Sequence, residues 1–293
     1  MAALTQKKSC SQIMDEWKLF MWNPETKEFM GRTASSWGLI LSFYIIFYAF
    51  LTAVFALSMY VMLQTIDQYT PKYEDRLGNP GLMIRPNLSV LDIAYNVNAS
   101  DTTWPTYVSS LNIALQDYNQ TVQEERGTNC TPGQYFTQDD TGSPTKQACR
   151  FVRDVLGECS GINDPTYGYP NGTPCVFIKM NRVVHFLPQT ISSLSNTSVT
   201  INCTGKNDQA LGPRVYFPST SANLGSLDLM YFPYYGNRAQ KNYTQPFVAV
   251  KFLNATRNML HTVQCSINAA NINNNDDRDK FQGRVIFTLR LNS

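Results

Sequence analysis

Seven cysteines are the side chains in this 293-residue chain with the clearest chemistry. Cys10 stands alone near the start, and six others are spread over residues 130–265. An even number of cysteines in an oxidising compartment indicates disulfide bridges, and pairing in sequence order is the simplest of several arrangements that remain open. Their spacings are not those of zinc sites. The six are Cys130, Cys149, Cys159, Cys175, Cys203 and Cys265.

Two histidines and one Asp-x-Asp motif are the other candidates for catalysis or metal binding. His185 and His261 each lie in an apolar run, which is more typical of a strand residue with a satisfied hydrogen bond than of a catalytic base. Asp277-Arg278-Asp279 matches the Asp-x-Asp motif with which Golgi glycosyltransferases bind a metal and a sugar nucleotide. However, it lies in an Asn- and Asp-rich turn, and no βαβ pattern surrounds it. We therefore expect no catalytic residue, no metal and no cofactor, and keep a type II Golgi glycosyltransferase as the enzyme alternative.

One uninterrupted apolar stretch, residues 38–63, must position everything else. GLILSFYIIFYAFLTAVFALSMYVML holds 26 residues and no charged side chain. As a helix it would be roughly 39 Å long, more than the ~30 Å hydrocarbon core of a bilayer. It is too long, and starts too far into the chain, for a cleaved signal peptide. We expect a single membrane-spanning helix here, with the lipid bilayer as a partner.

Aromatic side chains repeat at a helical spacing inside this stretch. Tyr44 and Tyr48 lie four residues apart and share one face, and Phe43 and Phe47 form a neighbouring row. A phenol inside the membrane needs a hydrogen-bond partner. This favours a partner helix over the alternative, an aromatic belt at the membrane interface.

Charges and glycosylation motifs indicate the orientation of the stretch. Five Lys or Arg side chains precede it, and only Lys72 and Arg76 lie in the first twenty residues after it. Because cytoplasmic flanks are enriched in Lys and Arg, we expect a cytoplasmic N-terminus. All nine Asn-x-Ser/Thr motifs, the acceptors of N-linked sugars, follow the stretch. Their asparagines are Asn87, Asn98, Asn119, Asn129, Asn171, Asn196, Asn202, Asn242 and Asn254.

The chain therefore divides into four parts. We expect a cytoplasmic tail at 1–37, the membrane helix at 38–63, a stalk at 64–86 and a glycosylated ectodomain at 87–293. The part after residue 63 carries 19 basic and 18 acidic side chains, which gives no strong field and predicts no nucleic-acid partner.

Hydrophobic periodicity predicts the elements of the ectodomain. A helical spacing runs over 104–122, and residues 91–97 alternate like a strand. Short apolar runs separated by turn residues then predict a β-sandwich of two sheets. These runs are 175–186, 199–203, 214–217, 227–232, 247–253, 260–267 and 284–291. The last is the clearest, with Val285, Phe287, Leu289 and Leu291 on one face.

Several longer motifs belong together. They are Trp22-Asn23-Pro24, Gly31-Arg32-Thr33 with Ser36-Trp37, the Phe43-Tyr44 and Phe47-Tyr48 pairs, CVFIKMNR from Cys175, YFPYYG from Tyr231 and the final GRVIFTLRLN. On these motifs the chain resembles, over its whole length, the β subunits of the Na,K- and H,K-transporting P-type ATPases. Within that family the likeness is greatest to the β2, glial-adhesion branch, and the gastric proton-pump branch comes next.

The resemblance implies a fold and a role. It implies a single-pass type II plasma-membrane protein, with an immunoglobulin-like β-sandwich interrupted by a long helix and three disulfides paired in sequence order. Such subunits have no catalytic activity: they help the catalytic α subunit to fold, assemble and reach the cell surface, and they tune its potassium affinity. The resemblance leaves room for a small single-pass regulatory subunit as a further partner, and for a second role in cell adhesion in trans.

The resemblance also implies the surfaces that meet the α subunit. The membrane helix would pack beside the seventh membrane helix of α, and the ectodomain would cap the loop between the seventh and eighth. The residues implied at these contacts are Tyr44, Phe47, Tyr48, Tyr231, Phe232, Tyr234, Tyr235 and Gly236.

Overall fold

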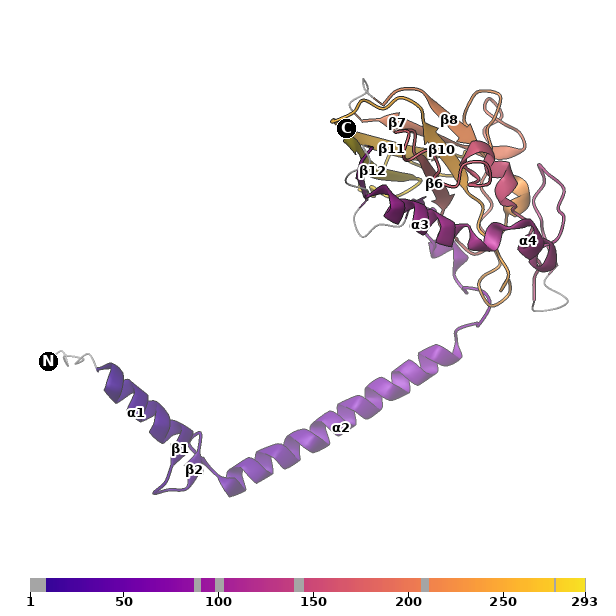
Figure 1. The fold of residues 1–293 in the computed structure, drawn as a ribbon. Coiled ribbons are helices and arrows are strands. Elements are labelled where there is room, and N and C mark those ends of the chain that lie inside the picture. Colours follow the sequence, from indigo (N-terminus) through magenta and orange to yellow (C-terminus); the bar gives the residue numbers. More distant parts are fainter. Residues whose placement is uncertain are drawn as a thin grey trace. The chain divides into compact units, whose positions relative to one another are not determined.

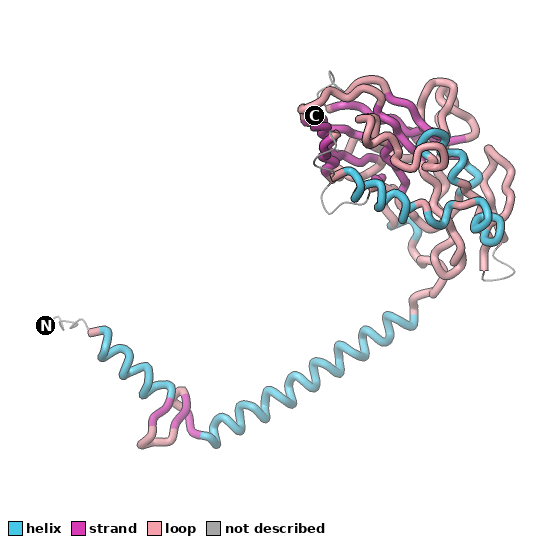
Figure 2. Tube along the Cα trace, in the orientation of Figure 1, coloured by secondary structure: helices cyan, strands magenta, loops and turns pink. Residues whose placement is uncertain are grey.

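The computed structural model describes residues 9–86, 91–97, 103–139, 145–206, 211–276 and 278–292. The chain folds into two compact units, Met1–Ile66 and Asp67–Ser293 (Figure 1). The first unit contains the long apolar helix, and the second contains nearly all of the sheet structure (Figure 2).

The first unit consists of two helices joined by a small three-stranded sheet. Helix α1 (Cys10–Met21) begins with a capping box between Ser9 and Gln12. Strands β1 (Trp22–Asn23), β2 (Glu28–Phe29) and β3 (Arg32–Thr33) follow, and the sequence patterns predict none of them. Helix α2 (Ala34–Gln64) begins at Ala34 because the Thr33 hydroxyl oxygen accepts a hydrogen bond from the Ser36 amide, which caps the helix. It extends the predicted span, 38–63, at both ends.

The second unit is built on two β-sheets. A four-stranded sheet has the order β4 (Leu82–Arg85), β6 (Cys175–Met180), β10 (Val248–Phe252), β8 (Arg214–Phe217). A five-stranded sheet has the order β5 (Asp92–Asn96), β12 (Arg284–Asn292), β11 (Leu260–Asn268), β7 (Ser198–Gly205), β9 (Gly225–Asp228). Every neighbouring pair is antiparallel except β12 and β5, which run parallel.

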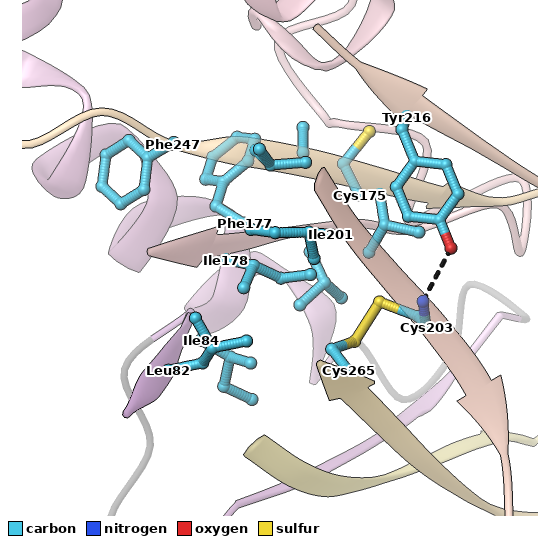
Figure 3. Close-up of a cluster of buried hydrophobic side chains, with 14 of the residues drawn as sticks. Leu82, Ile84, Cys175, Phe177, Ile178, Ile201, Cys203, Tyr216, Phe247 and Cys265 are labelled. Atoms are coloured by element: carbon cyan, nitrogen blue, oxygen red, sulfur yellow. Dashed lines mark hydrogen bonds between the residues drawn. A yellow bond between two sulfur atoms is a disulfide. The ribbon is translucent and has the colours of Figure 1, made fainter. Parts of the chain in front are cut away.

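The hydrophobic core draws on both sheets. Ile84 and Ile178 belong to the four-stranded sheet, Ile201 and Cys265 to the five-stranded one, and all four lie in one buried cluster (Figure 3). One polar group of this core, the Tyr216 hydroxyl, is satisfied, since its oxygen accepts a hydrogen bond of 2.9 Å from the Cys203 amide. The strand periodicity of the sequence therefore corresponds to the buried faces of two sheets.

The predicted helix over 104–122 is wrong as a continuous element. The structure has α3 (Trp104–Ala114), a 3₁₀ turn η2 (Gln116–Tyr118) and α4 (Gln120–Arg126) (Figure 1). The break occurs because Asn119 is extended, which lets the buried Tyr118 hydroxyl donate a 2.7 Å hydrogen bond to the Gln245 carbonyl oxygen. The apolar spacing continues through the break, so the pattern alone could not reveal it.

Two of the runs predicted as strands are strands over only part of their length. The run at 175–186 forms a strand only as β6, and the run at 227–232 ends as the 3₁₀ turn η4 (Leu229–Tyr231). Two further 3₁₀ turns, η1 (Glu74–Arg76) and η3 (Arg153–Cys159), complete the elements of the described ranges.

The expected stalk, 64–86, is shorter than predicted, because Leu82–Arg85 forms β4 and pairs with β6. Proline and glycine around residue 81 suggested an irregular chain there, although the apolar side chains of Leu82 and Ile84 are buried in the core.

Three disulfides join the six cysteines of the second unit in sequence order: Cys130–Cys149, Cys159–Cys175 and Cys203–Cys265. The third joins directly opposed residues of β7 and β11, whose Cα atoms are 3.9 Å apart. It is therefore a bridge between neighbouring strands of one sheet.

We expect loss of the third bridge to destabilise the second unit most. A Cys203→Ala/Cys265→Ala variant opens a 62-residue loop, which in the chain-entropy model lowers the free energy of unfolding by about 4 kcal/mol. Opening the 19-residue Cys130–Cys149 loop should lower it by about 3 kcal/mol. Chemical unfolding of the full-length chain in detergent measures both, with Cys10→Ser as control because Cys10 is exposed and unbridged. Equal stability of wild type and the Cys203/Cys265 variant would contradict this ranking.

Candidate functional site

The two histidines have different surroundings. His261 lies buried in β11, with Nε2 2.8 Å from the Thr256 carbonyl oxygen, so the strand prediction is confirmed for it. The same prediction is wrong for His185, which follows β6 with a left-handed backbone (φ 58°). Its Nδ1 lies 2.6 Å from Glu74 Oε1, and its ring meets the Tyr235 ring edge-on at 5.2 Å. In neither place does a nucleophile adjoin the imidazole in the described contacts.

The structure describes only part of the Asp-x-Asp motif near the C-terminus. Asp277 lies outside the described residues. Asp279 Oδ1 accepts a hydrogen bond of 2.9 Å from the Phe281 amide, a contact typical of a turn. Within the described ranges, no group of three or more His, Cys, Asp or Glu side chains could hold a metal ion.

An aromatic face on α2 is the most prominent exposed feature of the first unit. The Tyr44 and Tyr48 rings stack with centroids 6.0 Å apart, and so do the Phe43 and Phe47 rings. Tyr44 is 47% exposed, Phe47 42% and Tyr48 59%. In the described part of the chain, neither tyrosine hydroxyl has a hydrogen-bond partner. The predicted helical spacing therefore places these rings together on one face that the described residues of the first unit leave exposed.

The base of α2 is fixed by the short sheet before it. Trp37 Nε1 donates a 2.8 Å hydrogen bond to the Phe29 carbonyl oxygen, and the two rings lie 6.1 Å apart. Lys27 and Met30 have positive φ values, which make the sharp turns between β1, β2 and β3. The sheet thus sets the direction in which α2 leaves the tail. Sequence reasoning missed it because each strand is only two residues long.

The aromatic segment 231–236 lies in the second unit and is mostly buried. Tyr231, Phe232, Tyr234 and Tyr235 are each at most 9% exposed. Tyr235 Oη accepts a 2.7 Å hydrogen bond from the Gln138 amide. Burial raises the pKa of the Tyr231 and Tyr234 hydroxyls, so both stay neutral. These side chains therefore hold the segment in place, and their contact with another protein stays a prediction.

Gly236 ends this segment where it meets the chain that follows α2. Its φ is 92°, and a Cβ there would lie 3.2 Å from the Tyr69 carbonyl oxygen, so a side chain would be both strained and crowded. Two further contacts join the same regions: Glu74 with His185, and Gln68 with Arg238. The partners are 111 and 170 residues apart in sequence, so no local pattern could have predicted them.

The glycosylation motifs are mostly accessible. Asn87 and Asn98 lie outside the described residues. Asn202 is half-buried on β7, and its Oδ1 accepts a 3.3 Å hydrogen bond from the Tyr216 hydroxyl. The side chains of the other six are exposed: Asn119, Asn129, Asn171, Asn196, Asn242 and Asn254.

We expect Asn202 to carry no sugar while Asn196 does. β7 lies between β11 and β9, and a glycan on Asn202 would have to displace the Tyr216 contact. Asn196 lies just before the same strand and is exposed, which makes it a matched control. Mass spectrometry of peptides released by peptide-N-glycosidase in heavy-oxygen water measures both occupancies. Full occupancy at Asn202 would contradict the expectation.

Comparison with known proteins gives one consistent result. A family model described as "Sodium / potassium ATPase beta chain" matches residues 7–287. A relative from Rhinella marina, "Sodium/potassium-transporting ATPase subunit beta-2", is 66% identical, and the alignment covers 99% of each chain. Proteins with the same description from Mus musculus and Homo sapiens are 54% and 53% identical, each with 98% of both chains covered. The similarity therefore includes the tail, α2 and both sheets.

Proposed function

The chain belongs to the sodium/potassium ATPase beta chain family, and on that premise we propose how it serves a P-type pump. It is a non-catalytic accessory subunit of such a pump. We propose that it binds the catalytic α subunit of Na,K-ATPase or H,K-ATPase. Through that contact it would let α fold, assemble and reach the plasma membrane, and it would modulate the affinity for potassium.

Helix α2 carries the proposal. Its 31 residues include no charged side chain, none is buried within this chain, and in the described ranges it is the one helix long and apolar enough to cross a membrane. Lipid can cover its aliphatic side chains but offers no hydrogen-bond partner to Tyr44 and Tyr48. A neighbouring helix of α can supply both contact area and acceptors.

We propose a type II orientation, with α1 in the cytoplasm and the second unit outside. Three observations support it: more basic residues before α2 than just after it, glycosylation motifs only after it, and three disulfides in the second unit. We also propose that the two sheets of the second unit form an immunoglobulin-like β-sandwich.

The contact with α would have two parts. The aromatic face of α2, Tyr44, Phe47 and Tyr48, would lie against the seventh membrane helix of α. Segment 231–236 would meet the extracellular loop between the seventh and eighth helices. Because its aromatic side chains are buried, we propose that it presents its fixed backbone and the Gly236 turn to that loop. A small single-pass regulatory subunit would bind elsewhere on the complex.

Purification under mild detergent tests the proposed function. The full-length chain, tagged at its N-terminus and expressed in animal cells, should bring down a multi-span P-type pump subunit that mass spectrometry identifies. A single-span membrane glycoprotein of another family, tagged and expressed in the same way, serves as control. Recovery of the tagged chain without any pump subunit would contradict the proposal.

Adhesion in trans is a second candidate, favoured by the six exposed glycosylation sites of the second unit. Cells that display the full-length chain should then aggregate with one another. Aggregation that persists after the pump subunit is depleted would separate this role from the first. A glycosyltransferase role has no comparable support, since Asp279 caps a turn.

A further inference from the structure

A strongly basic cleft opens on the second unit, next to the aromatic segment 231–236 that is proposed to meet the pump subunit. Two residues of its lining touch that segment, since Arg182 lies 5.4 Å from the centre of the Tyr234 ring and the Tyr243 ring lies 4.7 Å from it. The volume of the cleft is about 290 Å³, near the lower end of the ~300–1,000 Å³ typical of small-molecule sites. Its cationic side chains come from separate parts of the chain: β4, α4, β6 and two loops. They are Arg85, Arg126, Lys179, Arg182 and Lys241.

The acidic side chains of the cleft do not balance these cations. Asp117 is the one carboxylate in its described lining, and it already pairs with Arg126, Nη1 to Oδ1, at 3.0 Å. Among the described residues, Lys179, Arg182 and Lys241 form no ion pair with a carboxylate. Three cations of the cleft therefore have no carboxylate partner in the part of the chain that the structure describes.

Lys179 is the cation held deepest. It is half-buried in β6, and burial, followed by the neighbouring Arg85 and Arg182 guanidinium groups, lowers the pKa of its ammonium to about 8. It is still mostly protonated at neutral pH, in a place where its charge is costly. A bound anion would offset the repulsion between Lys179 and the two guanidinium groups. The cleft therefore has the electrostatics of an anion-binding site.

The charge of the cleft and its surroundings indicate the class of ligand. Tyr118 and Phe247 also line the cleft, but both belong to the buried core, so its accessible surface is mainly polar and charged. Asn242, an exposed glycosylation acceptor, lies at the rim of the same cleft. With the second unit outside the cell, as proposed above, sulfated glycans are polyanions that this cleft would meet. Clusters of Lys and Arg are typical of heparin-binding surfaces.

We propose that this cleft binds a sulfated oligosaccharide, with sulfate groups contacting Lys179, Arg182 and Lys241. The choice of a sulfated glycan as ligand depends on the proposed orientation, because such glycans lie outside the cell. The anion-binding character of the cleft does not depend on it. A reversed orientation would appear as missing glycosylation, whereas a wrong cleft assignment would appear as failed binding in vitro.

Direct binding measurements test the site. The full-length chain, purified in mild detergent with its accompanying pump subunit, is immobilised through its N-terminal tag. A heparin-derived hexasaccharide and the same hexasaccharide without sulfates are the probes. We expect saturable, salt-sensitive binding of the sulfated probe only, and about a tenfold rise in Kd for Arg182→Gln/Lys241→Gln. Both side chains are exposed, so this variant should fold normally.

A charge-matched control separates the cleft from general attraction. Arg278→Gln/Arg290→Gln removes the same charge from exposed positions that do not line the cleft, and its Kd should stay within about twofold of wild type. A second variant, Lys179→Gln, should also raise Kd, and intact circular dichroism would establish its fold. Equal binding of the unsulfated probe, no binding of either probe, or equal weakening by the control variant would each overturn the proposal.

Discussion

A chain that ends at Arg284 should not form a folded second unit. The truncation removes nearly all of β12, which pairs with β11 on one side and β5 on the other. It also removes Val285, Phe287, Leu289 and Leu291, each at most 1% exposed. Losing their burial costs about 2 kcal/mol apiece, or roughly 8 kcal/mol, which is comparable with the whole stability of a typical domain.

Export from the endoplasmic reticulum measures this effect. The truncated chain should stay there with immature sugars and be degraded, and its three disulfides should not form in good yield. Arg290→Ala is the control, because Arg290 is exposed on the same strand and its loss changes stability by no more than about 0.5 kcal/mol. Normal export of the truncated chain would show that β12 is not needed for the core.

Replacing both tyrosines of the aromatic face should weaken binding to the pump subunit without unfolding either unit. Tyr44→Ala/Tyr48→Ala removes two exposed, stacked rings and two hydroxyl groups that have no partner among the described residues. Because the rings would lose their packing and their interhelical hydrogen bonds, we expect the free energy of binding to the pump subunit to weaken by about 2 kcal/mol. This corresponds to roughly a thirtyfold loss of affinity. The recovered ratio of pump subunit to tagged chain over a detergent series measures it.

The opposite face of α2 provides the matched control. Ile46 and Phe50 lie two residues on from each tyrosine, and therefore on the other side of the helix. Both are exposed and four residues apart, so Ile46→Ala/Phe50→Ala removes a similar amount of apolar surface. Co-purification should be close to wild type for this control. If both double variants lose the pump subunit equally, the binding face is not the one with the tyrosines.

The sequence was most informative where one periodicity continues without interruption. The charge-free run predicts α2 directly, and alternation along β12 predicts both the strand and its buried face. Cysteine count and spacing left the pairing open, and the family likeness supplied the order that the structure has. Each of these features depends on neighbouring residues alone or on a motif long enough to be specific.

The remainder depends on contacts that local patterns do not contain. The helix break at Asn119 follows from the distant Gln245 carbonyl that Tyr118 reaches, and β4 exists because β6 offers it an edge. The YFPYYG motif could be assigned to an interface by resemblance, but only the fold revealed that its rings are buried. The basic cleft is lined by residues that lie between positions 85 and 247 of the chain, so no local sequence pattern could predict it.

We propose above all that the chain crosses the membrane once and leaves everything from Asp67 onward outside the cell. Antibody labelling of tags at the two ends, on intact and on permeabilised cells, tests it most directly. The C-terminal tag should be labelled on intact cells, and the N-terminal tag only after permeabilisation. Labelling of the N-terminal tag on intact cells, with a hidden C-terminal tag, would contradict the orientation and the function built on it.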